Sequence, residues 1–253
     1  EIFEAKKLII ATGGKSYEVT GSSGDGYSFS KELGLKIVEP KPALTPCYIK
    51  DYSYTTLAGV SFRNAILELW RDNKKLGTYE GDLLFTHKNL SGPLIIDNSR
   101  YIKKDDKLRI NFSGENLEIF EKNLRNTINN NGNKFVKNIF DNPNFSERFI
   151  KVILKECEIS EETKCNSLKK EQIKRLIEAL GNHAYEVSKL EGFNIAMVTA
   201  GGVALEEINK NTMESKKIKD LYIVGELLDI DGDTGGYNIQ GAYSTGALAA
   251  ESI

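Results

Sequence analysis

The stretch LYIVGELLDIDGDTGGYNIQGAYSTGALAA, residues 221–250, predicts a strand, a glycine-rich turn and a helix in direct succession. Its first four residues form an apolar run that stops at Gly225, as in a strand covered on both faces of a parallel sheet. A helical pattern begins near Tyr237, directly after Gly235 and Gly236. Because the first N–H groups of a helix have no partner within it, glycines just before them let a ligand approach the backbone. We therefore interpret this stretch as one wall of a ligand site.

The acids of the turn narrow the kind of ligand. Asp229, Asp231 and Asp233 would repel an anion, so a simple phosphate cradle is disfavoured. A carboxylate suits the hydroxyls of a sugar or ribityl chain, as in dinucleotide folds where an acid accepts from a ribose hydroxyl. The helix also carries a stripe of small residues, at positions 242, 246 and 250, that suits close packing against a sheet or a bound ring system. The same three elements occur in α/β proteins that bind nothing there, so a purely structural turn stays open.

The composition is typical of a soluble globular protein, with 40% hydrophobic and 28% charged residues among 253. A net charge of −2 gives no overall attraction to nucleic acid or to an anionic membrane, and neither is expected as a partner. No apolar run approaches the roughly 18 residues that span a bilayer, and no signal peptide is recognisable. Three cysteines without metal spacing predict reduced thiols, no metal site and a cytoplasmic location.

A second buried strand is predicted at residues 8–10, and it runs into Thr12, Gly13 and Gly14. Ligands of open α/β sheets lie at the carboxyl ends of strands, so these small residues are candidate site positions. The loop GSSGDG at residues 21–26 resembles a phosphate loop in composition but lacks its Gly-Lys-Ser/Thr ending, which makes nucleotide-triphosphate binding the weakest hypothesis. A short helix is expected at residues 27–33, with Gly34 after its end.

The middle of the chain predicts an inserted unit. After Pro40 and Pro42 the sequence becomes β-like, and we place a boundary there. Strands are expected at residues 44–50, 60–70, 75–85 and 108–112, which suggests a small antiparallel sheet or barrel. Helices are expected within residues 115–158, one of them at 145–157 beginning near Ser146, and at 167–180 with Ser167 as N-cap and Gly181 as its stop. Strands return at residues 183–190 and 193–199.

These elements predict an α/β fold in which one part of the chain interrupts another. The α/β part comprises residues 1–41 and 193–253, and the insert comprises residues 42–192. Within the insert, residues 42–113 are β-rich, residues 114–181 are helical, and residues 182–192 return to β structure.

Several separate motifs resemble one family of bacterial flavoproteins. They are LIIATGG at residues 8–14, GSSGDGY at 21–27, LLFTHKNLSGP at 83–93, VTAGGV at 198–203, TME at 212–214, LYIVGELLD at 221–229 and TGGYNIQ at 234–240. In this order they are similar to the NAD(P)/FAD-dependent oxidoreductases that include aminoacetone oxidase and 3-dehydro-bile-acid reductase. The resemblance runs along nearly the whole chain.

The resemblance implies a fold and a cofactor. The fold would be part of a glutathione-reductase-like FAD-binding domain, interrupted by a β-barrel-like insert with a helical subdomain. Asp229 would contact the ribityl or phosphate portion of FAD, and the backbone at residues 236–240 would face the pyrimidine edge of the flavin. A helix N-terminus suits that edge because reduced flavin carries negative charge near N1 and O2. The implied cofactor-binding residues are Thr12, Gly13, Gly14, Gly225, Asp229, Gly235, Gly236, Tyr237, Asn238, Ile239 and Gln240.

Two features depart from the family pattern. No Gly-x-Gly-x-x-Gly element, which would hold the ADP half of FAD, precedes Glu1, and a Ser-Gly-Gly-Gly-Arg-Cys-Asn segment is missing. We therefore expect the chain to be the C-terminal portion of a longer flavoprotein, with an incomplete FAD site and no activity by itself. In addition, Glu18 stands where the family usually has a proline after the Ser-Tyr pair.

The leading functional hypothesis is an FAD-dependent oxidoreductase that acts on a small amine, ketone or related substrate. NAD(P)H is a candidate electron donor, although no second dinucleotide fingerprint occurs, and an oxidase that uses oxygen stays open. No catalytic residue is assigned: Tyr17, His87 and Glu226 are candidates, and each also has an ordinary structural explanation. The alternative is a non-catalytic interaction module whose insert recognises a partner. The sequence does not specify the oligomeric state.

Overall fold

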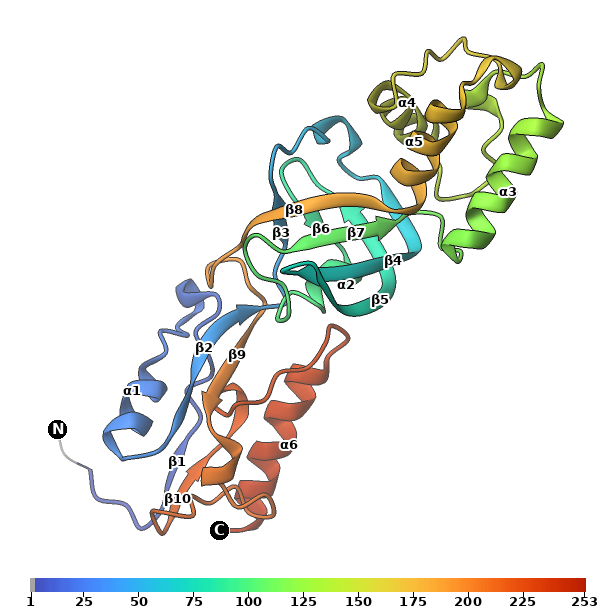
Figure 1. The fold of residues 1–253 in the computed structure, drawn as a ribbon. Coiled ribbons are helices and arrows are strands. Elements are labelled where there is room, and N and C mark those ends of the chain that lie inside the picture. The colour runs from blue at the N-terminus through green and yellow to red at the C-terminus, as the bar shows by residue number, and fades with distance from the viewer. Residues whose placement is uncertain (1–2) are drawn as a thin grey trace. The chain divides into compact units, whose positions relative to one another are not determined.

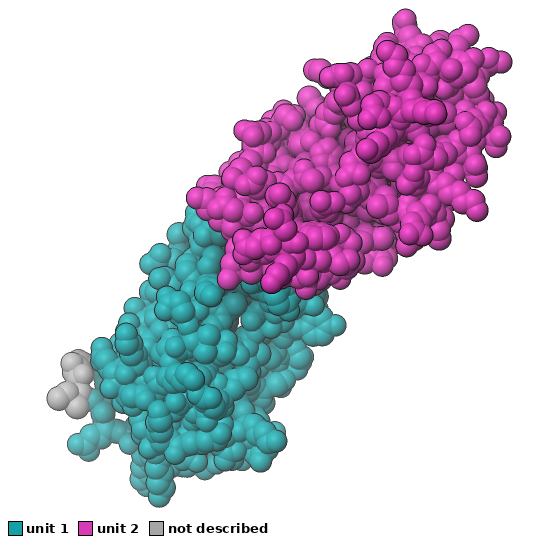
Figure 2. Space-filling view, viewed as in Figure 1, with its two compact units in different colours: residues 1–45, 99–101, 191–253 teal, residues 46–98, 102–190 magenta. Residues whose placement is uncertain are grey.

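The computed structural model describes residues 3–253, so the first two residues of the expected 1–41 segment lie outside the described part. The chain divides into two compact units, shown in different colours in Figure 2. Unit 1 contains the chain up to residue 45, residues 99–101 and residues 191–253, and unit 2 contains residues 46–98 and 102–190. No helix in residues 3–253 is long and apolar enough to cross a membrane.

Unit 1 is built around the two strands that the sequence predicts most clearly (Figure 1). Strand β1 (Leu8–Ile10) pairs in parallel with β10 (Leu221–Ile223), and Ile10 lies opposite Ile223. Helix α1 (Asp25–Glu32) and helix α6 (Tyr237–Glu251) follow the two strands, which confirms both predicted helices. The buried side chains of β10 pack with those of neighbouring segments in one apolar cluster, so the strand is covered as its composition predicts.

A second, antiparallel pair corrects two expectations. Strand β2 (Ile37–Ala43) runs through Pro40 and Pro42, so these prolines lie inside a strand and do not end one. Proline is tolerated because β2 pairs only with β9 (Val198–Val203) in the described part of the chain, and the pairing register shifts between Val38 and Lys41. The last strand of the sequence analysis, residues 193–199, was placed too early.

Close backbone approach explains why β9 contains glycines, which lie beyond the end of the strand predicted at residues 193–199. A Cβ atom added to Gly201, whose φ is +90°, would lie 2.6 Å from the carbonyl oxygen of Glu39. One added to Gly202 would lie 2.5 Å from the carbonyl oxygen of Leu227. Both glycines are therefore required within the strand because no side chain fits there.

Unit 2 contains a closed barrel, which confirms the β-barrel-like insert. Its strand order is β3-β6-β5-β4-β7-β8. The hairpin of β4 and β5 turns through Asp72 and Asn73, with φ of +50° and +60°, as a tight hairpin requires. A short helix, α2 (Pro93–Ile96), follows β6. The strands are β3 (Cys47–Ile49), β4 (Ser61–Arg71), β5 (Lys74–Phe85), β6 (Leu90–Ser91), β7 (Lys107–Asn111) and β8 (His183–Leu190).

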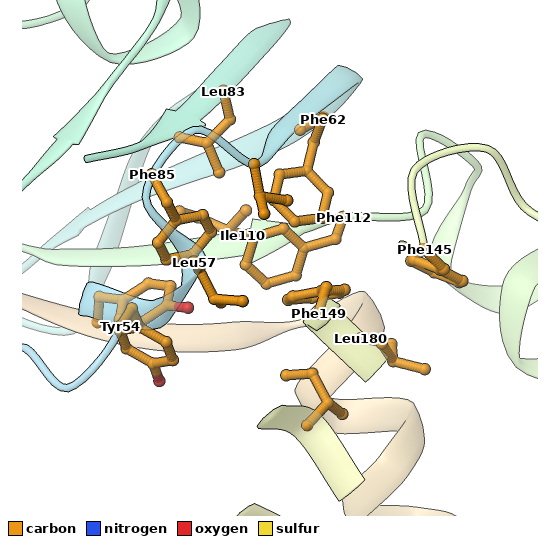
Figure 3. Close-up of a cluster of buried hydrophobic side chains, with 14 of the residues drawn as sticks. Tyr54, Leu57, Phe62, Leu83, Phe85, Ile110, Phe112, Phe145, Phe149 and Leu180 are labelled. Carbon is orange, nitrogen blue, oxygen red and sulfur yellow. The ribbon is translucent and has the colours of Figure 1, made fainter. Parts of the chain in front are cut away.

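Aromatic side chains join the barrel to the helices of unit 2 (Figure 3). The ring of Phe62, on β4, lies 4.7 Å from the rings of both Phe112 and Phe149, measured between centroids. Phe149 belongs to helix α4 and is fully buried. The barrel and this helix therefore share one apolar core and are expected to fold as one cooperative unit.

The helical subdomain has three helices, α3 (Leu117–Asn130), α4 (Glu147–Glu156) and α5 (Lys170–Gly181). Ser146 caps α4 as predicted, because its hydroxyl accepts from the N–H of Phe149. Ser167 does not cap α5. The N-cap is Lys169, whose backbone N–H donates to the side chain of Gln172, and Gly181 belongs to the helix itself. The three cysteines are free and buried.

Candidate cofactor site

The carboxyl ends of β1 and β10 lie at the same edge of unit 1 because the two strands are parallel and in register. The N–H of Val224 donates to the carbonyl of Ile10 at 3.2 Å, which extends the pairing by one residue. Segments 12–14 and 225–229 consequently leave the sheet together. This is the position at which open α/β sheets bind ligands.

Helix α6 presents an uncapped N-terminus near this edge. Its N-cap residue is Gly236, with φ of +93°, which has no side chain to accept from the N–H groups of the first turn. Gly235 also has a positive φ, +112°, so two successive glycines shape the approach to the helix. The side chains of Tyr237 and Ile239 are 67% and 79% exposed. The first turn of α6 therefore combines backbone donors, which its N-cap residue does not bind through a side chain, with accessible apolar surface.

A cavity of about 370 Å³ lies beside this turn. Four of the predicted site residues line it: Gly225, Tyr237, Asn238 and Ile239. Met197, Val198 and Thr245 also line it, and the sequence analysis did not select them. The other predicted positions are not among its lining residues; they are Thr12, Gly13, Gly14, Asp229, Gly235, Gly236 and Gln240.

Asn238 and Thr245 fix the walls of the cavity by local hydrogen bonds. The Asn238 side chain accepts from the N–H of Gly232 at 2.8 Å and donates to its carbonyl at 2.9 Å, which closes the acidic turn against α6. The Thr245 hydroxyl accepts from the N–H of Gly225 at 2.9 Å, which ties the end of β10 to the helix. Both side chains therefore act on the shape of the cavity.

Two acids of the turn form ion pairs with a residue that the sequence analysis did not consider. The Arg100 guanidinium lies 2.8 Å from Asp231 and 3.0 Å from Asp233. Burial raises the pKa of Asp231, and the nearby Arg100 charge opposes that rise. The expected repulsion of an anion is weakened, because each of these two carboxylates has a cationic partner.

Glu226 lies at the centre of a polar network between the two strand ends. Its Oε1 accepts from the N–H of Thr199 at 2.6 Å, and its carboxylate also accepts from the backbone of Gly14. Burial raises the pKa of Glu226, and these two hydrogen bonds oppose that rise. A Cβ atom on Gly14 would lie 2.8 Å from the Glu226 carboxyl carbon, so glycine is needed for this contact. Glu226 therefore holds the site together through backbone contacts.

Thr199, which the sequence analysis missed, completes this network. Its buried hydroxyl accepts from the N–H groups of Lys15 at 2.8 Å and Ser16 at 3.1 Å. The hydroxyls of Ser16 and Thr199 also lie 3.1 Å apart. One side chain on β9 thus fixes the loop that follows β1. Only long-range pairing brings it there, so local sequence pattern carries no signal for it.

Three predicted site residues near the strand ends, Thr12, Gly13 and Asp229, have structural roles in packing or in the backbone. A Cβ atom on Gly26 would lie 2.0 Å from the Thr12 hydroxyl, so Thr12 packs closely against helix α1. Gly13 has φ of +75°, which favours glycine. The N–H of Asp229 donates to the carbonyl of Val203 at 2.9 Å. The proposed contacts of these residues with FAD stay predictions.

The remaining catalytic candidates lie apart from the cavity lining. Tyr17 has φ of +54° at the start of a short turn, and its backbone N–H donates to the carbonyl of Phe193. His87 is exposed in a loop of unit 2. Within residues 3–253, no group of His, Cys, Asp and Glu side chains is arranged to hold a metal ion.

The donor set and the open surface of α6 fit a flavin. An added Cβ atom on Gly241, which lines the cavity, would meet no atom within 4 Å, so the helix leaves room for a ring system there. The backbone N–H groups at this helix N-terminus suit an edge that carries negative charge. The cavity is smaller than a whole FAD molecule would need, and it matches a site for one part of it.

The fold and this edge define a Rossmann-like α/β domain that carries an inserted barrel. The chain belongs to the HI0933-like family: residues 1–252 match the HI0933-like protein Rossmann domain. This match and the similarity to a named reductase support, at the level of the family, an oxidoreductase of the flavin type.

Three curated relatives are similar over nearly the whole chain. A ribosomal RNA dihydrouridine synthase of Haemophilus influenzae is 28% identical over 99% of this chain and 61% of its own length. A 3-dehydro-bile acid delta(4,6)-reductase of Clostridium scindens is 30% identical over 99% of this chain and 62% of its own. A ribosomal RNA dihydrouridine synthase of Escherichia coli is 30% identical over 98% of this chain and 60% of its own. The chain thus spans about three fifths of the length of these relatives.

Proposed function

We propose that this protein is a flavin-dependent reductase that adds two hydrogens across a carbon–carbon double bond in an unsaturated ring. The relatives support this reaction, because a dihydrouridine is a uridine with two added hydrogens and a delta(4,6)-reductase is named for the double bonds that it reduces. The observation that carries the proposal is the N-terminus of α6, with its glycine N-cap, beside a cavity. The similarity to these reductases gives this site its proposed chemistry.

The residues of the site would bind and orient FAD, which would supply the hydride-transfer chemistry. The N–H groups of Tyr237, Asn238 and Ile239 favour a negatively charged edge next to the helix. Arg100 reduces the repulsion from Asp231 and Asp233. Glu226 and Thr199 hold the two strand ends in one arrangement, so the cavity is preformed.

Several finer expectations stay predictions. They are the glutathione-reductase-like arrangement, the likeness to aminoacetone oxidase, NAD(P)H as electron donor, and an incomplete FAD site in this chain. A small amine or ketone substrate is also a prediction, and it would be favoured by oxidase activity in place of reductase activity.

The test is a substrate comparison under anaerobic conditions. The FAD-loaded protein would be incubated with NADPH and either a uridine-containing RNA transcript or a steroid dienone. Mass spectrometry would detect the gain of two hydrogens, and heat-inactivated protein would be the control. We expect one of the two rings to be reduced.

Two other results would contradict the proposal. Turnover of a small amine or ketone with oxygen uptake, and with no reduction of either ring, would replace the reductase with an oxidase. FAD-loaded protein that turns over none of these compounds would favour the interaction module.

A further inference from the structure

The outer surface of the barrel carries cations around the single tryptophan of the chain. Strand β4 lies between β5 and β7 (Figure 1), and the pairing register places Lys75 and Lys107 on either side of Trp70. Arg109 lies diagonally opposite on β7, with its guanidinium carbon 5.2 Å from the centroid of the Trp70 ring. Leu69 and Leu108, which alternate with these residues, are fully buried, so the cations and the ring face outward.

The adjoining turns extend this positive surface. At the end of the β4–β5 hairpin, Lys74 pairs with Arg71. Arg71 binds the buried carboxylate of Asp106 at 2.7 Å, and this carboxylate also accepts from the N–H of Lys103 at 2.7 Å. Lys103 and its neighbour Lys104 are therefore held beside the hairpin. We define the basic face as these exposed or half-buried residues: Lys74, Lys75, Lys103, Lys104, Lys107, Arg109 and Trp70.

The charge balance of this region differs from that of the whole chain. Eight cations lie here against five acids, a local net charge of +3 in a chain of −2; the cations are Lys50, Arg71 and those of the basic face, and the acids are Glu68, Asp72, Asp105, Asp106 and Glu186.

Most of the acids already have cationic partners. Asp106 binds Arg71, and both Asp105 and Glu186 bind Lys50. In contrast, no ion pair within residues 3–253 joins Lys74, Lys103, Lys104 or Lys107 to a carboxylate. These four exposed lysines are available to an anionic partner.

The tryptophan is held in a fixed orientation. The Glu68 carboxylate accepts from the indole Nε1 of Trp70 at 2.9 Å and from the ammonium group of Lys75 at 2.9 Å. Because the only donor of the indole is occupied, the ring can interact with a further partner mainly through its π surface. A cation stacked on an aromatic ring, with lysines around it, is the combination that binds stacked bases and their phosphates.

We propose that the basic face binds single-stranded RNA, with lysines contacting phosphates and an unpaired base stacking on the Trp70–Arg109 pair. The choice of RNA rests on the proposed function, for which two relatives named as ribosomal RNA dihydrouridine synthases supply the precedent. The sequence analysis predicted no nucleic-acid partner because the net charge is negative, but the total hides this local excess. Unpaired bases are also the form in which proteins usually read RNA.

The test measures binding of a labelled, uridine-rich RNA oligonucleotide by fluorescence anisotropy over a series of salt concentrations. The variant K103E/K104E would be compared with K122E/K170E, which makes the same change in charge at exposed lysines of α3 and α5. We expect the first variant to bind at least about tenfold more weakly. The slope of the logarithm of affinity against the logarithm of salt concentration should fall in magnitude by about 1.4, because about 0.7 counterions are released per phosphate contact on a single strand and two contacts are lost. The control variant should bind like the wild type.

A third variant separates stacking from charge. Trp70→Leu should weaken binding by about tenfold while leaving the salt slope unchanged, because stacking releases no counterions. Circular dichroism would confirm that each variant is folded.

Three results would overturn the proposal. They are no RNA binding by the wild-type chain, equal losses in K103E/K104E and K122E/K170E, or stronger binding to phosphatidylserine vesicles that K103E/K104E abolishes. The last result would assign the face to an anionic membrane. The assay needs neither FAD nor turnover, so RNA binding without double-bond reduction would contradict only the proposed function, and reduction without RNA binding would contradict only this inference.

Discussion

At the scale of single residues, the site depends on polar contacts between segments far apart in the chain. Thr199 and Glu226 are 27 positions apart, and Thr199 lies 184 positions from Lys15. The sequence analysis selected Gly14 as a ligand contact, whereas the structure shows it packed against Thr199 and Glu226. Local pattern could not identify these partners, because the pairing of β9 brings them together.

Removing the Thr199 hydroxyl should destabilise unit 1. In Thr199→Val, the N–H groups of Lys15 and Ser16 lose their common acceptor at nearly constant side-chain volume. We expect a loss of about 1–3 kcal/mol in the free energy of unfolding, measured by urea denaturation followed by circular dichroism. Thr199→Ser keeps the hydroxyl and should lose clearly less. Equal losses in the two variants would mean that the methyl group, and not the hydroxyl, matters.

Unit 2 should become less stable in mild acid because of His183. Its Nδ1 lies 3.2 Å from the carbonyl of Ala179, its Nε2 lies 3.1 Å from the Tyr54 hydroxyl, and its ring stacks on Tyr185. Burial lowers the pKa of His183 below its ordinary value of 6.5, although Glu156, the Ala179 carbonyl and Glu178 oppose this. The folded protein therefore favours neutral His183, and stability should be lost as the pH falls below about 6.5, where the unfolded chain takes up the proton.

The fluorescence of Trp70, the single tryptophan, allows this to be measured in unit 2 itself. Urea titrations at a series of pH values between 8 and 5.5 would give the free energy of unfolding as a function of pH. The range is chosen around the ordinary histidine pKa of about 6.5. His183→Gln should flatten the curve. If the free energy of unfolding of that variant depends on pH as it does in the wild type, the pH dependence belongs to other groups.

At the scale of elements, a segment was predicted well where one local signal decides its structure. The strands β1, β10, β4 and β5 and the helix α6 have clear apolar runs or periodic patterns, and the structure confirms them. Strand β2 was missed because its prolines are typical of a break, and they are tolerated because the strand has a single partner within residues 3–253. The strand predicted at residues 193–199 likewise stopped before the glycines of β9, since the backbone contacts that require them are long-range.

Two glycines of helix α6 provide a matched test of the cavity. Gly241 lines it and Gly246 does not, and an added Cβ atom at either position would meet no atom within 4 Å. Both Gly→Ala changes should therefore stabilise the chain by about 0.5–1 kcal/mol, since alanine is the better helix former. Only Gly241→Ala should weaken FAD binding, measured by quenching of flavin fluorescence. Equal FAD affinity in the two variants would place the flavin elsewhere.

At the scale of the whole molecule, the interrupted α/β organisation could be predicted because motifs at both ends of the chain belong to one domain. The closed strand order of the barrel and the placement of residues 99–101 in unit 1 could not. Arg100, which forms ion pairs with Asp231 and Asp233 of the acidic turn, enters unit 1 from within the sequence of the insert. Such a contact depends on the path of the chain and leaves no local pattern.

The measurement that tests the central claim most directly is the visible absorbance spectrum of the natural protein, recorded as purified and again after incubation with FAD and removal of the excess. We predict flavin absorbance bands that remain with the protein and bleach when NADPH or dithionite is added under anaerobic conditions. A natural protein that stays colourless after reconstitution would contradict the flavin site at α6 and favour the interaction module.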